Sequence, residues 1–410
     1  MKILFVTKNA PYPVKGGSSQ RTAILIDALS QIGEVSLFFI GTPLRKEILE
    51  KKGYRVAAAA EPCRQKRDFK GVILEKLFGN TGNKLWRTLA GVKVDFTPDP
   101  CLNERLLELL RQEKFDLIVG RYLIPSAQAG LFEPGMPPVI VDVDDVNSKS
   151  ATALIQSPAS GLVMRKIMQY RLKEIVKYES MLWAKATRLW FPNSEDLLLV
   201  DSGAADLVPN IPYDILGKSD LSSSAKDSQI VLWVGSFDHR VNLEGVDYFL
   251  KMAWMKIKNA KPEAIFRIVG SHLTESVKNR WQEIEGVEVI GYAENLYPHY
   301  RDAALSVVPL MDGAGTKIKI LESLAYKRTC VITRHSLKGY EGLLHDEQCV
   351  RISEDVDGLV QPIVYLLNNP QLRWQMEEAG RSIIENNFTR QTVSRYIMNS
   401  VTSLYNKERV

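Results

Sequence analysis

Short apolar runs alternate with segments of helical periodicity along the chain, and no other feature constrains its fold as strongly. The apolar runs are continuous, as in strands that are buried on both faces of a parallel sheet. Strands that alternate with helices predict a doubly wound α/β domain, and the alternation occurs once in each half of the chain. The predicted strands are residues 3–6, 35–40, 117–119, 139–143 and 189–191 in the first half, and 230–234, 265–269, 287–290, 305–308 and 330–332 in the second.

Helical periodicity marks several segments between and after these strands. Asn193 predicts a capped helix start, because two acidic residues follow it in the first turn. The other predicted helices are 21–29, 104–110, 243–250, 370–387 and 389–405. Periodicity alone leaves open whether the last helix packs on the second domain or returns to the first.

The length and composition agree with two globular domains. A chain of 410 residues suits two domains of about 200 residues each. The segment 208–227 holds two prolines and a run of three serines and lacks periodicity, so we predict a linker there. The composition, 45% hydrophobic and 25% charged, excludes collagen-like, disordered and coiled-coil classes. We expect a cytoplasmic protein, because no run of about 18 apolar residues occurs and the first residues predict a strand rather than a signal peptide.

The positive charge is concentrated in one segment. The net charge is +5, and residues 64–93 contain eight basic and two acidic residues, so the rest of the chain carries −1. A nucleic-acid-binding protein usually spreads its basic residues over a whole face, and we therefore do not expect that function. Apolar side chains interleave with the basic ones, which suits a peripheral contact with anionic lipid at the inner face of a membrane. A solvated basic insertion is the alternative.

The cysteines and histidines show no pattern of a metal site. Four cysteines lie far apart without a C-x-x-C pair, and the five histidines are scattered. We therefore predict buried thiols, no disulfide and no metal site. The cysteines are Cys63, Cys101, Cys330 and Cys349.

The segment 309–325 carries the strongest signal for a ligand. A predicted strand ends there, glycines 313 and 315 form a turn, and a helix is expected to start near Thr316. Bare glycine backbone, free N–H groups at a helix start and a nearby ammonium group form an anion site. Lys317 in a first helical turn opposes the helix dipole, so it calls for a negative partner such as a phosphate. Glu322 lies in an otherwise apolar helix and could accept two hydroxyl hydrogen bonds from a ribose, although a solvated glutamate is the alternative.

Three other segments could contribute to a site. Gly16 and Gly17 join the first strand to a helix, but they form neither a P-loop nor a G-x-G-x-x-G motif. The carboxylates at 142, 144 and 145 follow a strand and could serve as a base, metal ligands or acceptors for sugar hydroxyls; a structural turn is the alternative. Gly235 and Arg240 follow the first strand of the second half, where Arg240 could meet a diphosphate or lie on the surface.

These motifs resemble the GT-B glycosyltransferases, specifically the GT4-type retaining family, glycosyl transferases group 1. The strand at 3–6 with Gly16 and Gly17 is similar to the family's donor and acceptor loop. The segment from Gly313 to Glu322 is similar to its nucleotide-sugar signature, and the 234–242 loop to its first second-domain loop. Gly291 stands where the family reads the base through backbone atoms. The likeness spans nearly the whole chain.

The resemblance implies a fold and a domain arrangement. The fold is α/β, with two Rossmann-like doubly wound domains facing each other across a cleft. The implied domains are an acceptor-side domain at 1–207, a linker at 208–227, a nucleotide-sugar-binding domain at 228–387, and a final helix at 388–410 that crosses back to the first domain. The similarity of the segment 381–388 to the family's ending favours that return.

The resemblance also implies site residues, with some departures. Gly16, Gly17, Gly235, Gly291, Gly313, Gly315, Thr316, Lys317, Arg240 and Glu322 would bind the donor. Ala314 stands where the family often has a first glutamate, and Ser236 and Asn242 stand where it has an arginine and a lysine. These changes shift the diphosphate role onto Lys317 and Arg240. The family's first-domain histidine has no match, and Asp144 and Asp145 are the catalytic candidates.

The expected function is transfer of a sugar from a nucleotide diphosphate sugar to a glycan or lipid-linked acceptor, with retention at the anomeric carbon. No metal or other cofactor is expected, because cations and helix N-termini can stabilise the leaving diphosphate. A nucleotide-sugar epimerase or hydrolase on the same scaffold is one alternative. A nucleotide-sugar-binding protein without catalysis, suggested by Ala314, is the other.

Overall fold

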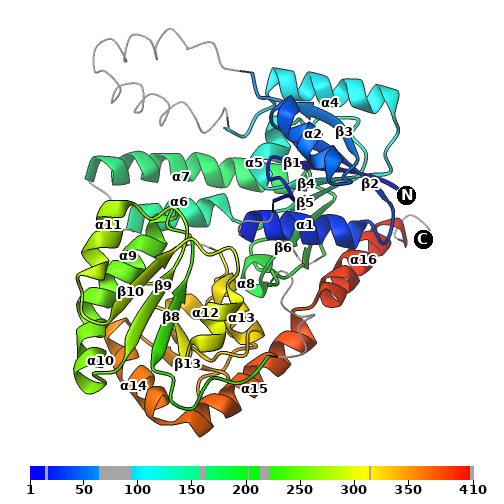
Figure 1. The fold of residues 1–410 in the computed structure, drawn as a ribbon. Helices are drawn as coiled ribbons and strands as arrows, with labels where there is room; N and C mark the ends of the chain where they lie inside the picture. Colours follow the sequence, from blue (N-terminus) through cyan, green and yellow to red (C-terminus); the bar gives the residue numbers. More distant parts are fainter. Residues whose placement is uncertain are drawn as a thin grey trace. The chain divides into compact units, whose positions relative to one another are not determined.

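The computed structural model describes residues 1–13, 17–63, 95–156, 162–201, 203–212, 221–313 and 315–406. The chain forms two compact units, one of Met1–Pro209 with Val393–Val410 and the other of Asn210–Thr392. Each unit is built around one parallel sheet, with helices between successive strands (Figure 1). The predicted α/β class with two doubly wound domains is confirmed.

The described part of the first unit holds a seven-stranded parallel sheet in the order β3-β2-β1-β4-β5-β6-β7. In the centre, Leu4 of β1 lies opposite Ser36 on one side and Ile118 on the other. The strand between them is fully buried from Ile3 to Val6, which explains its continuous apolar sequence. The strands are β1 (Lys2–Thr7), β2 (Glu34–Ile40), β3 (Val56–Ala60), β4 (Leu117–Arg121), β5 (Val139–Asp142), β6 (Arg188–Phe191) and β7 (Ala205–Leu207).

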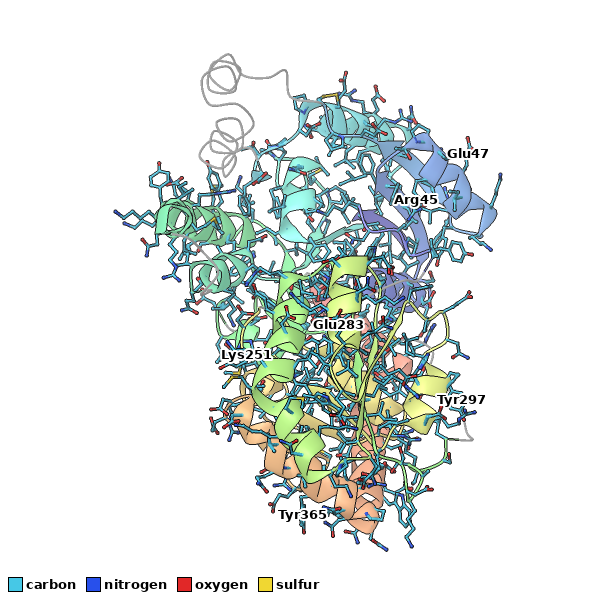
Figure 2. The ribbon with its side chains drawn as sticks, turned by 60° about the vertical axis from the view of Figure 1, so that its left-hand side comes forward. Arg45, Glu47, Lys251, Glu283, Tyr297 and Tyr365 are labelled. Atoms are coloured by element: carbon cyan, nitrogen blue, oxygen red, sulfur yellow. A yellow bond between two sulfur atoms is a disulfide. The ribbon has the colours of Figure 1, made fainter. Side chains whose placement is uncertain are left out.

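Helices of the first unit fill the connections between these strands. They are α1 (Gly17–Leu29), α2 (Pro43–Lys51), α4 (Pro100–Gln112), α5 (Leu123–Gln128), α6 (Asn147–Gln156), α7 (Leu162–Trp183), α8 (Ser194–Leu197) and the C-terminal α16 (Arg390–Asn406). Arg45 and Glu47 of α2 are exposed to solvent (Figure 2). The predicted cap at Asn193 is present, because its side chain accepts a hydrogen bond from the backbone N–H of Asp196.

Helix α16 is anchored to the first unit by side-chain hydrogen bonds. The indole of Trp190 in β6 donates to Ser400 Oγ at 2.8 Å, and Ser400 in turn donates to Asp206 Oδ2 at 2.5 Å. Farther along the helix, the hydroxyl of Tyr405 donates to the carbonyl of Asp116 at 3.0 Å. The end of the chain is therefore part of the unit in which the chain begins.

The second unit has a six-stranded sheet among its described residues, in the order β10-β9-β8-β11-β12-β13. Its strands are β8 (Ile230–Val234), β9 (Ile265–Val269), β10 (Val287–Gly291), β11 (Leu305–Val308), β12 (Cys330–Thr333) and β13 (Val350–Ser353). The chain runs outward from β8 to β10 and then returns to β11 on the other side of β8. This reversal makes the carboxyl ends of β8 and β11 the switch point at which open α/β sheets bind ligands.

Helices cover both faces of this sheet, with α9 and α11 on one side and α12 and α13 on the other (Figure 1). The helical segments are α9 (Arg240–Phe249), η1 (Leu250–Trp254), α10 (Met255–Ala260), α11 (Glu275–Gln282), α12 (Tyr297–Asp302), α13 (Ile318–Ala325), η2 (His335–Leu337), η3 (Asp357–Leu359), α14 (Val360–Asn368) and α15 (Pro370–Asn387). Right-handed crossovers place helices on opposite faces when the strand order reverses, which accounts for this division.

Part of the predicted linker is packed rather than free. Ser224 is buried, and its backbone N–H donates to Glu377 Oε2 of α15 at 3.0 Å. Arg373 of the same helix donates to the carbonyl oxygens of Ala225 and Lys226. Because a buried guanidinium satisfies backbone carbonyls here, residues 221–226 belong to the second unit.

The three strands missing from the sequence prediction are β3, β7 and β13. Each lies at an edge of its sheet, where a strand has a neighbour on one side only. The sequences are correspondingly weak: β3 is mostly alanine, β7 has three residues, and β13 alternates an arginine with apolar residues. The continuous apolar pattern identifies the strands in the middle of each sheet and misses three of the four edge strands; the fourth, β10, was predicted.

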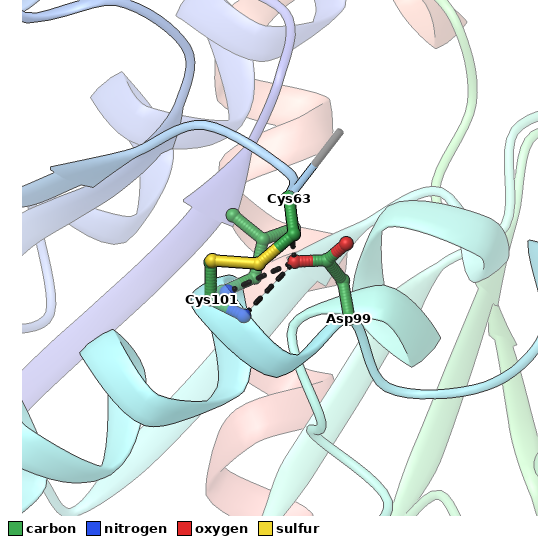
Figure 3. The surroundings of a disulfide bond; sticks show 4 residues. Cys63, Asp99 and Cys101 are labelled. Atoms are coloured by element: carbon green, nitrogen blue, oxygen red, sulfur yellow. Dashed lines mark hydrogen bonds between the residues drawn. A yellow bond between two sulfur atoms is a disulfide. The ribbon is translucent and has the colours of Figure 1, made fainter. Parts of the chain in front are cut away.

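The prediction of no disulfide is wrong. Cys63, just after β3, is bonded to Cys101 in the first turn of α4, with the Cα atoms 5.5 Å apart (Figure 3). Asp99 Oδ1 accepts hydrogen bonds from the backbone N–H groups of Cys63 and Cys101 and so fixes both ends. The cysteines are 38 residues apart, and only the packing of β3 against α4 brings them together. Cys330 and Cys349 are buried free thiols, as predicted.

The basic segment 64–93 lies outside the described residues, as do Gly16 and Ala314. In the part of the chain that the structure describes, no helix has the length and apolarity needed to cross a bilayer.

Candidate nucleotide-sugar site

The glycine turn predicted after β11 is present. Gly313 and Gly315 have φ angles of 104° and 75°, a region that side-chain-bearing residues rarely adopt, so the turn requires glycine at both positions. The helix starts at Ile318, two residues later than expected, and Lys317 directly precedes it. The argument that Lys317 opposes the helix dipole from the first turn is therefore wrong. Next to the turn, the Thr316 hydroxyl accepts a hydrogen bond from Asn210 at 3.2 Å.

The Lys317 amine closes the turn. Its Nζ donates to the carbonyl oxygens of Gly313 at 3.0 Å and Gly315 at 2.7 Å, and its side chain is buried. His335 approaches the same loop, with Nε2 3.1 Å from the Gly313 oxygen. Burial, together with the charge of Lys317, lowers the pKa of His335. Lys317 thus fixes the conformation of the turn whose backbone N–H groups would meet a phosphate.

Glu322 occupies the second turn of α13 on its partly buried side. Burial raises the pKa of its carboxyl group to about 7, and the hydroxyl of Tyr300 donates to its Oε2 at 3.4 Å. Burial also raises the pKa of Tyr300 well above its ordinary value. The Glu322 carboxylate thus accepts a hydrogen bond from a hydroxyl group within the protein. A carboxylate of this kind can accept hydrogen bonds from sugar hydroxyls in the same way.

The loop after β8 lies beside the glycine turn, because β8 and β11 are paired. Asn242, in the first turn of α9, donates to the Ser236 carbonyl at 2.6 Å and accepts from Lys319 Nζ at 2.7 Å. Gly235 lies against the same amine, since a Cβ at Gly235 would come 3.0 Å from Lys319 Nζ. Arg240 instead forms ion pairs with Glu244 and Asp312.

Lys319 is a site residue of the second unit to which the sequence prediction assigned no role. Its Nζ lies 3.9 Å from the centroid of the Trp233 ring, in addition to its bond to Asn242. The sequence offered one signal, because Asn242 stands where the resembled family has a lysine. In the structure, the amine of Lys319 reaches the side chain of Asn242 from α13, so a lysine amine lies beside this position although α9 does not supply it. Gly291, at the end of β10, has a φ angle of 82° and open space around the position of a Cβ.

The first unit places its charged cluster at the carboxyl ends of β4 and β5. Asp142 is fully buried and accepts hydrogen bonds from Arg21 of α1 at 2.5 Å and from Arg121 of β4 at 2.6 Å. Gly17, the first residue of α1, lies one turn before Arg21. The two arginines were not predicted as site residues, and their only sequence signal is their position at the start of a helix and the end of a strand.

Asp144 is bonded to this cluster, whereas Asp145 is exposed. Arg121 donates to Asp144 Oδ2 at 2.7 Å, and the hydroxyl of Tyr122 donates to the same oxygen at 3.1 Å. Burial opposes the charge of Arg121, but Asp144 and Asp142 raise its pKa above its ordinary value. Asp145 is exposed, whereas Asp144 and Tyr122 have left-handed backbone angles, with φ of 36° and 66°. Strained backbone at a strand end is typical of functional sites.

Comparison with protein families finds a match within the second unit. Residues 228–369 match the family described as glycosyl transferases group 1. This range contains both loops at the switch point, together with Lys319 and Glu322. A comparison with curated protein sequences finds no match.

Solved structures resemble the whole chain. Sucrose-phosphate synthase from Thermosynechococcus elongatus has a TM-score of 0.69 at 16% identity, with 99% of each chain covered. HepE from Anabaena in complex with UDP-glucose has a TM-score of 0.63 at 13% identity, with 98% of this chain and 100% of that chain covered. TarM from S. aureus in a complex that contains UDP has a TM-score of 0.64 at 11% identity, with 97% and 99% covered. The expected likeness to the GT-B glycosyltransferases is confirmed: residues 228–369 match the glycosyl transferases group 1 family, and the chain has the GT-B fold of these solved structures.

Proposed function

We propose that this protein transfers a sugar from a nucleotide diphosphate sugar to a glycan, glycolipid or other acceptor, with retention of the anomeric configuration. The observation that carries the proposal is the glycine turn closed by Lys317, with Glu322 one helical turn beyond, inside a glycosyl transferases group 1 domain. Related structures that contain UDP or UDP-glucose support a nucleotide sugar as the donor. The product would belong to a cell-surface polysaccharide or glycoconjugate.

The proposed chemistry uses the protein's own groups and no metal. Backbone N–H groups of the turn would bind the diphosphate, and the Glu322 carboxylate would accept hydrogen bonds from the ribose hydroxyls. Positive charge next to the leaving diphosphate stabilises the negative charge that develops there in the transition state. No general base is assigned, because the leaving phosphate can accept the proton of the acceptor hydroxyl. Asp144, held by Arg121 and Tyr122, is the candidate for contacting the acceptor or the sugar.

The test is turnover with a panel of nucleotide sugars. We expect release of the nucleoside diphosphate from at least one donor, faster with an acceptor than without it, and unchanged in the presence of a metal chelator. Nuclear magnetic resonance of the glycosidic product reports whether the anomeric configuration is retained. Tight donor binding without turnover would support the non-catalytic alternative, and turnover to an epimer or free sugar alone would support the epimerase or hydrolase.

We also propose peripheral contact with an anionic membrane, through residues 64–93 as expected from the sequence and through α7. On α7, Lys166, Lys173 and Lys177 are exposed on one stripe with Tyr170 and Met181, and the partly buried Glu174 borders this stripe. Lysines beside large apolar groups suit the surface of anionic lipid. Location at the inner face of a membrane stays a prediction. The Cys63–Cys101 disulfide counts against it, because disulfides are uncommon in a reducing compartment.

Vesicle sedimentation tests this contact. We expect the protein to sediment with phosphatidylserine-containing vesicles at low salt and not with neutral ones. Replacing Lys166, Lys173 and Lys177 by glutamine is expected to weaken binding about 100-fold, at about 1 kcal/mol for each lysine. Equal sedimentation of wild type and triple variant would remove α7 from the contact, and no sedimentation of the wild type would remove the membrane.

A further inference from the structure

Three cationic side chains lie near the switch point of the second unit, and two of them bond backbone carbonyls or carboxylates of the protein. Lys317 donates to the carbonyls of its own turn, and Arg240 pairs with Glu244 and Asp312. These are the two cations to which the sequence assigned the diphosphate. The N–H donors of Lys317 and the charge of Arg240 are therefore already engaged in shaping the two loops.

Lys319 differs from both of these side chains. Among the described residues, the acceptor of its hydrogen bond is the neutral side chain of Asn242, and its other close partner is the Trp233 ring. The amine of Lys319 forms no ion pair with a carboxylate of the described residues. An ammonium group has three N–H donors, so two remain for another acceptor. The side chain keeps partial exposure, through which a ligand can reach it.

The surroundings of Lys319 hold its amine at one place. Asn242 is itself fixed, because its amide donates to the Ser236 carbonyl at 2.6 Å. A Cβ atom at Gly235 would lie 3.0 Å from Lys319 Nζ, so the absence of a side chain at Gly235 provides the space for the amine. The amine thus lies between the β8 loop and α13, at the carboxyl ends of the paired strands β8 and β11. This is where the fold places a ligand's phosphates.

Resting on the proposed function, we propose that Lys319 is the cation that binds the diphosphate of the donor, and that it takes up a proton when the donor binds. A negative ligand supplies the counter-ion that the ligand-free amine lacks. Asn242 is then a positioning residue for Lys319. The lysine that the resembled family carries at the position of Asn242 is replaced here by one that reaches the same loop from the neighbouring helix.

The proton uptake follows from the groups that face the amine. Burial lowers the pKa of Lys319 to about 7, the nearby charge of Lys317 lowers it further, and Glu322 and Cys330 act in the opposite direction. The ligand-free amine is therefore mostly neutral above pH 7. Binding of an anion favours the charged form, so affinity falls as the pH rises above about 7, by up to about tenfold per pH unit. Below pH 7 the amine is already charged and this dependence ends.

Inorganic pyrophosphate distinguishes the contribution of Lys319 to the pH dependence of binding from that of Glu322. The pKa of the Glu322 carboxyl is also about 7, but Glu322 would contact only the ribose, which pyrophosphate lacks. Calorimetric titration in two buffers of different ionisation enthalpy measures proton uptake at pH 8. We expect the wild type to take up about one proton more than Lys319→Met per bound pyrophosphate, since the titration of the ligand itself is common to both. At pH 6.5, where the amine is charged, Lys319→Met is expected to bind pyrophosphate about 10- to 100-fold more weakly.

Two further variants make the result specific. Lys319→Arg carries a permanent charge, so it is expected to keep most of the affinity and lose the additional proton uptake. The exposed Lys251, in η1 beyond the end of α9 (Figure 2), gives the matched control Lys251→Met, which is expected to behave as the wild type. UDP binding is measured alongside. Equal affinity and equal proton uptake in wild type and Lys319→Met would overturn the role of Lys319 and leave the proposed function standing. Absence of binding of every nucleoside diphosphate to the wild type would overturn the proposed function itself.

Discussion

Replacing Glu322 by glutamine is expected to weaken binding of the nucleoside diphosphate by about 10- to 100-fold at pH 8. A hydrogen bond to a charged group contributes about 1.5–3 kcal/mol, and the glutamine amide keeps the size of the side chain but only one neutral acceptor oxygen. Calorimetry with UDP and with inorganic pyrophosphate measures the loss. Only UDP is expected to respond, because pyrophosphate has no ribose.

The pH dependence of this effect has a definite sign. Burial raises the pKa of Glu322 to about 7, so the carboxyl is protonated below that pH and loses its strength as an acceptor. The advantage of the wild type over Glu322→Gln is therefore expected to shrink as the pH falls through 7. A ratio of affinities that stays constant from pH 6 to pH 8 would contradict the role of the carboxylate.

The free energy of unfolding shows whether the loss of UDP affinity in Glu322→Gln arises from misfolding. The raised pKa means that the folded protein binds more protons than the unfolded chain between about pH 4.5 and 7, so Glu322 lowers the stability of the wild type as the pH rises through that window. Glu322→Gln lacks this contribution and is expected to be at least as stable as the wild type at pH 8. The exposed Glu283 (Figure 2) provides the control Glu283→Gln, for which neither binding nor stability should change.

The sequence predicts the central strands well because burial on both faces leaves a continuous apolar run. It predicts β8, β9 and β11 with the bounds that the structure has. The strands β3, β7 and β13 were not predicted, because an edge strand does not require a continuous apolar run. The same physical limit applies to the Cys63–Cys101 disulfide, which depends on how an edge strand packs against a helix 38 residues away in sequence.

At the candidate site, the local sequence pattern predicts some residues and cannot predict the contacts of others. The glycine turn and Glu322 are visible because their chemistry depends on residue types at fixed spacing in one segment. The partners of a long side chain depend on the tertiary structure, and so the sequence could not separate Lys317, whose amine bonds its own turn, from Lys319, whose amine reaches another helix. The same holds for Arg21 and Arg121, which lie 100 residues apart and meet at Asp142.

Replacing Arg121 by methionine is expected to reduce the stability of the first unit by about 3–5 kcal/mol, the usual loss when one partner of a buried ion pair is removed. Arg121 is fully buried and bonds Asp142 and Asp144 at 2.6 and 2.7 Å. Methionine fills a similar volume but leaves the buried charge of Asp142 to Arg21 alone. Hydrogen exchange of the peptides from β4 and β5 measures the loss within this unit, independently of how the second unit unfolds.

Two controls show that the loss comes from the uncompensated carboxylate. Arg105 pairs with Glu108 on the surface of α4, and Arg105→Met is expected to change stability by no more than about 0.5 kcal/mol, since exposed ion pairs contribute little. In the Arg121→Met background, Asp142→Asn removes the buried negative charge and is expected to restore part of the protection, a coupling that independent sites do not show. Additive losses in the double variant would mean that Arg121 stabilises the strand by packing alone. The cluster would then hold Asp144 in place without the electrostatic link from Arg21 through Asp142 to Arg121.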